Sequence, residues 1–167
     1  MFENIIKNVH NRHPLIHCIT NYVSINDCAN IVLACGGAPI MAEDINEVSQ
    51  ITSLCQGLDI NIGMLNDNKL SSMLKAGATA NELGIPVILD PVGAGSSDYR
   101  IKAVQNLMSN VQFGVIRGNV SEIKAIAAKQ GIHNIAAGVY DTMQKDKSAM
   151  GVEAGIADKI TDDNIKE

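Results

Sequence analysis

The stretch that most constrains the fold of this chain runs from residue 86 to residue 95, Pro-Val-Ile-Leu-Asp-Pro-Val-Gly-Ala-Gly. Its apolar residues end on Asp90, a pattern typical of a strand that is buried on both faces of a sheet. Pro91 has no N–H to donate and ends the strand, and Gly93 and Gly95 then let the backbone approach a bound ligand closely. Open α/β sheets bind ligands at such strand ends. A plain strand stop with a tight turn explains the same residues equally well.

Short apolar runs alternate with helical patterns along most of the chain. This alternation is the pattern of an α/β fold with a mostly parallel sheet flanked by helices. Asp44 and Glu47 have the spacing of a capping box, so a helix is expected to begin there. Strands are predicted at residues 15–19, 38–41, 58–62, 86–90 and 113–116, and helices at residues 2–9, 23–35, 44–56, 68–83, 98–109 and 119–129.

The pattern weakens after Gly131. Residues 132–160 show little periodicity, and Thr161 begins what looks like a helix only a few residues before the chain ends at Glu167. The length of 167 residues and the lack of a linker predict a single domain, residues 1–167. We expect this domain to be truncated, with the C-terminal part of the fold missing.

Composition excludes several classes of protein. The net charge of −5, the lack of a Lys/Arg cluster and the scarcity of aromatic residues argue against nucleic-acid binding. Cys18, Cys28, Cys35 and Cys55 have no metal-ligand spacing, so buried free thiols in a reducing cytosol are expected. There is no signal peptide and no apolar run near the ~18 residues of a membrane span, which predicts a soluble, cytoplasmic protein.

Two carboxylates could serve charged ligands. Asp90, at a strand end beside glycines, could hold Mg²⁺ directly or through water. Glu122 could do the same, but it also lies three residues after Asn119, the spacing of a capping box built on Asn. Hydrogen bonding to the next turn and helix capping therefore remain open for both carboxylates.

Three further residues lie at or just after the ends of predicted strands. Arg117 lies between a strand and a helix start, where its guanidinium suits a phosphate, although a solvated surface arginine is also possible. Asn21 could hydrogen-bond a heteroaromatic ligand and Met41 could pack on its face, but each is by itself an ordinary turn or core residue. The chain has no P-loop motif, and its paired glycines alone are a weak sign of a dinucleotide-dependent oxidoreductase.

Taken together and in order, several segments resemble the hydroxyethylthiazole kinase family of the ribokinase-like superfamily, which acts in thiamine salvage. Residues 150–155 are similar with substitutions, whereas residues 132–149 fit the family poorly. The matching segments are residues 14–23, 36–42, 61–63, 80–86, 89–95 and 115–122.

The resemblance implies a ribokinase-like fold and a transferase that uses ATP and Mg²⁺ to phosphorylate the hydroxyl of 4-methyl-5-(2-hydroxyethyl)thiazole. It also implies a homotrimer whose thiazole site lies between subunits. The site residues that it implies are Asn21 and Met41 for the thiazole, Arg117 and Asn119 for ATP, and Asp90 and Glu122 for Mg²⁺ and the phosphates.

One family motif has no counterpart in the chain. Members of the family carry a Gly-Thr-Gly-Cys or Gly-Thr-Gly-Asp stretch that forms the anion hole at a helix start, and the 167 residues contain neither. The catalytic residue therefore stays unassigned. The alternative expectation is an inactive fragment that acts at most as a small-molecule binding or assembly module.

Overall fold

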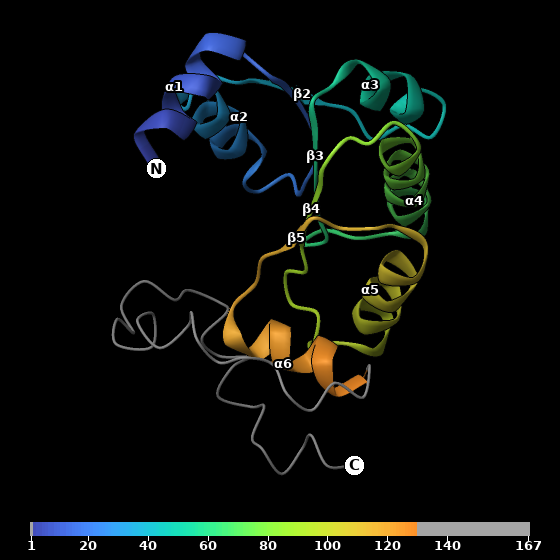
Figure 1. Ribbon diagram of the computed structural model, residues 1–167. Coiled ribbons are helices and arrows are strands. Elements are labelled where there is room, and N and C mark those ends of the chain that lie inside the picture. Colours follow the sequence, from blue (N-terminus) through green and yellow to red (C-terminus); the bar gives the residue numbers. More distant parts are fainter. Residues whose placement is uncertain (1, 130–167) are drawn as a thin grey trace.

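The computed structural model describes residues 2–129, which form alternating helices and strands (Figure 1). Residues 132–149, residues 150–155 and the helix start at Thr161 lie outside the described part of the chain. The elements are α1 (Phe2–Arg12), β1 (Leu15–Ile19), α2 (Ile25–Ala34), β2 (Ala38–Met41), α3 (Val48–Leu54), β3 (Gly57–Asn61), α4 (Asp67–Glu82), β4 (Val87–Asp90), α5 (Asp98–Asn110), β5 (Val115–Ile116) and α6 (Val120–Lys129).

The five strands of the described residues form one sheet in the order β2-β1-β3-β4-β5, and every pair is parallel. This confirms the expected α/β fold. The chain first turns from β1 to β2 on one side and then crosses to β3 on the other side of β1. Such a reversal leaves the loops after β1 and β3 diverging, which makes the carboxyl ends of these two strands the natural place for a ligand.

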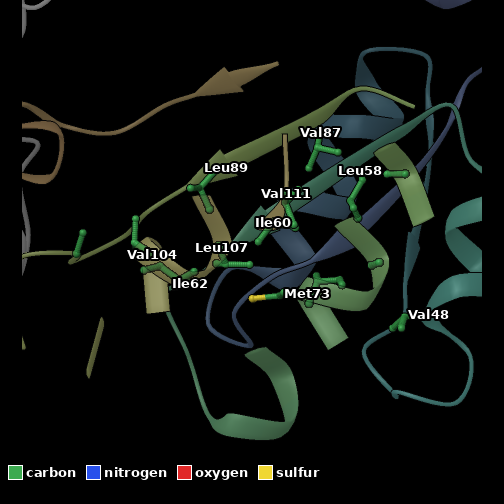
Figure 2. Packing of buried hydrophobic residues seen from close by; sticks show 14 of the residues in the cluster. Val48, Leu58, Ile60, Ile62, Met73, Val87, Leu89, Val104, Leu107 and Val111 are labelled. Carbon is green, nitrogen blue, oxygen red and sulfur yellow. The ribbon is translucent and has the colours of Figure 1, made fainter. Parts of the chain in front are cut away.

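One face of the sheet carries the apolar core. α3 and α4 pack together, α4 packs against β3 and β4, and α5 packs against α4 (Figure 1). Figure 2 shows Leu58 and Ile60 of β3 and Val87 and Leu89 of β4 in this cluster, with Met73 of α4. All five side chains are at most 1% exposed. The period of two along β3 and β4 therefore places every second side chain in one continuous core.

The opposite face contradicts one expectation. Ile88 of β4 is 40% exposed and its register partner Val115 is 52% exposed, so β4 is not buried on both faces. Among the described residues, α2 packs against β2 and α6 packs against α5 rather than over this part of the sheet. An apolar run predicts a strand, but it does not show which of its faces the neighbouring elements cover.

Helix starts were predicted with mixed success. The side chains of Asn66 and Ser97 cap α4 and α5. The expected capping box of Asp44 and Glu47 is wrong, because α3 begins only at Val48 and Glu47 makes no side-chain cap. Asp44 instead accepts a bond from the backbone N–H of Asn46, which closes a local turn before the helix.

The cysteines are free, as expected, but not all buried. Cys18 and Cys55 are buried, and burial is the first cause that raises the pKa of the Cys18 thiol to about 12. Cys28 is half-buried, and Cys35 is exposed because it caps the end of α2, where Gly36 turns the chain with a φ of 90°. No helix among the described residues is long and apolar enough to cross a membrane.

Candidate active site

The carboxyl ends of four adjacent strands bring four polar side chains to one edge of the sheet. Asn21 follows β1, Asn61 ends β3, Asp90 ends β4 and Arg117 follows β5. Because these strands are neighbours in the order β1-β3-β4-β5, the four residues stand side by side across the edge. We call Asn21, Asn61, Asp90 and Arg117 the polar row.

Hydrogen bonds join the polar row from end to end. Asn21 Nδ2 donates to Asn61 Oδ1 at 3.3 Å, and Asn61 Nδ2 donates to Asp90 Oδ2 at 3.0 Å. Arg117 Nη1 lies 3.4 Å from the same Asp90 oxygen. Three of the four residues were predicted as site residues, and the structure brings them together. Asn61 was not, although residues 61–63 are one of the segments that resemble the family and Asn61 is a polar residue at the end of a buried strand.

Arg117 extends into solvent. Its side chain is 78% exposed and its ion pair with Asp90 is long, so the pair contributes at most ~1 kcal/mol. Burial raises the pKa of Asp59 on β3, and the charge of Arg117 opposes this rise. The exposure of Arg117 agrees both with a phosphate ligand and with a surface arginine, so its role in ATP binding stays a prediction.

Glu122 and Asn119 form the expected capping box at the start of α6. The backbone N–H of Asn119 donates to Glu122 Oε2 at 2.8 Å, and that of Glu122 donates to Asn119 Oδ1 at 2.9 Å. Glu122 also reaches the turn after β4, where its Oε1 accepts from the Gly93 N–H at 2.8 Å. Gly93 has a φ of 65°, a conformation that favours glycine. Glu122 is thus 5% exposed and ties α6 to the turn that follows Asp90.

The metal assignment stays a prediction. Within residues 2–129 there is no group of three or more His, Cys, Asp and Glu side chains that could hold a metal ion. Mg²⁺ commonly takes only one or two carboxylates, with phosphate oxygens and water as its other ligands. Asp90, whose side chain is 21% exposed at the sheet edge, fits that kind of ligand set. Both oxygens of Glu122 already accept backbone N–H groups, so its geometry supports the capping interpretation first.

A buried cation fixes the loops on the β1–β2 side. Lys69 of α4 is 3% exposed, and its Nζ donates to Thr20 O at 2.8 Å and pairs with Glu43 at 2.8 Å. It also lies 4.4 Å from the centre of the Tyr22 ring, whose hydroxyl donates to Glu43. Burial disfavours the Glu43 carboxylate, but the bonds from Lys69 and Tyr22 outweigh it and lower the pKa of Glu43. Lys69 thereby holds the residues next to Asn21 and two positions after Met41.

His17 of β1 supports the same loops from within the core. Its Nε2–H donates to Ala42 O at 2.8 Å, and its Nδ1 lies 2.9 Å from Thr52 Oγ1 of α3. Burial lowers the pKa of His17, while the bond to Ala42 and the charge of Glu47 work in the opposite direction. The bond from His17 to Ala42 therefore fixes the backbone directly after Met41.

A second arginine fixes the loops on the other side. Arg100 of α5 donates through Nη1 to Ile62 O at 2.8 Å and to Val92 O at 2.7 Å, and through Nη2 to Gly63 O at 2.8 Å. These carbonyl groups belong to the turns after β3 and β4. The helical pattern of α4 and α5 gave no sign that Lys69 or Arg100 faces the sheet edge.

One cavity lies beside the site. It measures about 550 Å³ and is lined by residues 43–45 and by polar residues of the start of α4, including Lys69 and Ser72. Met41 and Asn21 do not line it. Met41 ends β2 and is half-buried, so it stays a predicted contact for a thiazole outside this cavity.

Comparison with known proteins gives a consistent family. The model of the "Hydroxyethylthiazole kinase family" matches residues 6–162. A hydroxyethylthiazole kinase of Clostridium acetobutylicum is 52% identical over 165 residues, which are 99% of this chain and 55% of that protein. A hydroxyethylthiazole kinase of Desulfovibrio desulfuricans is 46% identical over 166 residues, which are 99% of this chain and 53% of that protein.

A solved structure supports the same grouping. The hydroxyethylthiazole kinase protein of Pyrococcus horikoshii matches with a TM-score of 0.75 and 41% sequence identity, covering 77% of this chain and 50% of that chain. The chain thus spans about half the length of the relatives that it matches.

Proposed function

The chain belongs to the hydroxyethylthiazole kinase family, and from this premise we propose that it binds a thiazole alcohol and ATP for phosphoryl transfer to the alcohol. The proposed substrate is 4-methyl-5-(2-hydroxyethyl)thiazole, with Mg²⁺ as cofactor. We further propose a single domain over residues 1–167, a homotrimeric assembly with the site between subunits, and a cytoplasmic protein.

The polar row is the observation that carries this proposal. It joins the loop after β1, where Asn21 is proposed to meet the thiazole, to the ends of β4 and β5, where Asp90 and Arg117 are proposed to meet the phosphates. Phosphoryl transfer depends chiefly on positioning and on charge stabilisation. An edge with a neutral amide end and a charged end suits an alcohol acceptor beside a nucleotide phosphate.

Each residue has a proposed task. Asn21 and Met41 bind and orient the thiazole ring. Arg117, with Asn119 at the start of α6, binds phosphate oxygens and offsets their charge. Asp90, with Glu122 nearby, would hold Mg²⁺, which neutralises phosphate charge when it is bound.

The test of this proposal is binding by the 167-residue chain. We expect 4-methyl-5-(2-hydroxyethyl)thiazole and Mg·ATP each to give saturable binding in calorimetric or NMR titrations. Asn21→Leu is expected to weaken binding of the thiazole alcohol at least tenfold, about 1.4 kcal/mol, and to leave ATP affinity much less affected. If neither ligand binds at millimolar concentration, the proposed function is wrong for this chain.

A binding or assembly module is the second candidate. One observation favours it: the 167 residues contain no Gly-Thr-Gly-Cys or Gly-Thr-Gly-Asp stretch. Loss of a single preorganised oxyanion donor costs ~10²–10³ in rate. This second candidate predicts no measurable phosphate ester, by mass spectrometry, after incubation of this chain with ATP, Mg²⁺ and the thiazole alcohol. Product at the rate of an active kinase would exclude the second candidate.

A further inference from the structure

We propose that Asn61 is a positioning residue that couples the thiazole half of the site to its phosphate half. The inference rests on the proposed function for the identity of the two ligands. The link itself comes from the contacts of Asn61, which stands in the polar row between Asn21 and Asp90 and is 8% exposed.

The direction of every bond around Asn61 is fixed by its partners. The backbone N–H of Gly63 can only donate, and it lies 2.8 Å from Asn61 Oδ1, so this oxygen faces Gly63. Asn61 Nδ2 therefore faces Asp90, an acceptor, at 3.0 Å. In the same way the N–H of Ser24 fixes Asn21, whose Oδ1 accepts from it at 3.0 Å and whose Nδ2 must then donate to Asn61. Neither amide can turn over without losing at least two bonds at once.

The consequence is that the two halves of the site constrain each other across the point between β1 and β3 where the strand order reverses. A ligand that fixes Asn21 also fixes the acceptor side of Asn61, and Asn61 then holds the Asp90 carboxylate that Arg117 contacts. Because Asn61 is nearly inaccessible to water, a broken bond in this row is not readily replaced by hydration. If one ligand acts through the row to raise the affinity for the other, the second ligand must raise the affinity for the first by the same factor, since coupling between binding sites is reciprocal.

Gly63 offers a way to break the link without removing a polar group. A Cβ at this position would lie 2.9 Å from Asn21 Nδ2 and 2.9 Å from Asn61 Oδ1. Gly63→Ala therefore inserts a methyl group between the two amides and pushes them apart. Gly114→Ala is the matched control, because a Cβ there would meet nothing closer than Val87 O at 3.7 Å.

The decisive experiment measures the affinity of the 167-residue chain for the thiazole alcohol with and without saturating Mg·ATP. In the unaltered chain and in Gly114→Ala we expect one ligand to raise the affinity for the other by at least ~5-fold. In Gly63→Ala, and in Asn61→Leu, which removes both arms of Asn61, this factor is expected to fall to about one while each ligand still binds alone. A purely structural role would weaken both affinities and leave their ratio unchanged.

Two results would overturn the inference. One is an unaltered chain that binds both ligands with no coupling between them. The other is a coupling factor that survives in Gly63→Ala and Asn61→Leu.

A ligand-free measurement keeps the link testable if the proposed function fails. Denaturant unfolding measures the stability of three variants, Asn21→Ala, Asp90→Ala and the double variant. The set is measured first in the unaltered chain and then in a chain that also carries Gly63→Ala. We expect the two changes to be non-additive in the unaltered chain by a factor of ~2 or more in the folded-to-unfolded ratio, and additive with Gly63→Ala. Additive effects in the unaltered chain would overturn the inference whether or not any ligand binds.

Discussion

The two halves of the candidate site use their cations in opposite ways. Lys69, on the thiazole half, is 3% exposed and its ammonium group is used by Thr20 O, Glu43 and the Tyr22 ring. Arg117, on the phosphate half, is 78% exposed and makes one long contact with Asp90. A buried cation that several protein groups bind holds the surrounding loops in place, whereas an exposed cation with a weak partner can still bind an incoming anion. The difference predicts that stability depends on the first cation and ligand affinity on the second.

The largest expected effect comes from Lys69→Met. It leaves Thr20 O without its donor and Glu43 without its cation, which costs ~2–3 kcal/mol of the free energy of unfolding. Urea unfolding followed by circular dichroism checks this loss. Lys75→Met is the control on the same helix, since Lys75 is exposed and bonds only to Ile45 O in the described structure, and it should cost less than ~1 kcal/mol. Equal losses in both variants would remove the contrast between the two cations.

Arg117→Ala should show the reverse pattern. We expect its affinity for ATP to fall at least tenfold, about 1.4 kcal/mol for one lost charge-assisted contact, with little change in stability. Calorimetric titration of ATP with Mg²⁺ measures the first quantity and denaturant unfolding the second. Arg12→Ala, on the exposed face of α1, is the matched control. Unchanged ATP affinity would make Arg117 an ordinary surface arginine.

Glu122→Gln separates capping from metal binding on the phosphate half. The amide keeps one acceptor oxygen, but its NH₂ group must then face an N–H, either that of Gly93 or that of Asn119. We expect a loss of about 1 kcal/mol in stability, the usual scale of a lost cap. If the carboxylate serves the metal, the affinity of the folded variant for ATP in the presence of Mg²⁺ should also fall. If binding persists in the folded variant, Glu122 is a capping residue only.

The smallest expected effect is a pH dependence confined to the thiazole half. Because burial lowers the pKa of His17 below its ordinary 6.5, its stabilisation is present above that value and is lost as the pH falls toward the lowered pKa. His17→Gln should flatten this loss between pH 6.5 and mildly acidic pH. Thermal unfolding of both chains across that range measures it. The same acid slope in the variant would assign the pH dependence to other groups.

The sequence predicted the elements better than their surroundings. Apolar runs and the capping pair of Asn119 and Glu122 are local signals, and they predicted the existence and order of the described strands and helices, with starts up to four residues from the observed ones. Lys69 and Arg100 were missed because a charged residue in a helical pattern is normally solvated, and only the crossing of α4 and α5 over the sheet turns them inward. Asn61 was missed because its role depends on hydrogen bonds to Asn21 and Asp90, which lie 40 and 29 residues away along the chain.

The strand order also has a consequence for how the chain folds. In the finished sheet β3 lies on the edge of β1 that β2 leaves free, and β4 and β5 extend the sheet from that side, so each later strand can pair only with one that precedes it in the chain. The ribosome delivers the strands from the N-terminus onward, and parallel pairing is slow because each step closes a long loop. The polar row is therefore expected to assemble in the order in which the ribosome delivers it, from Asn21 to Asn61 to Asp90 to Arg117. A nascent chain halted before β4 would carry an Asn61 amide with no carboxylate to receive it.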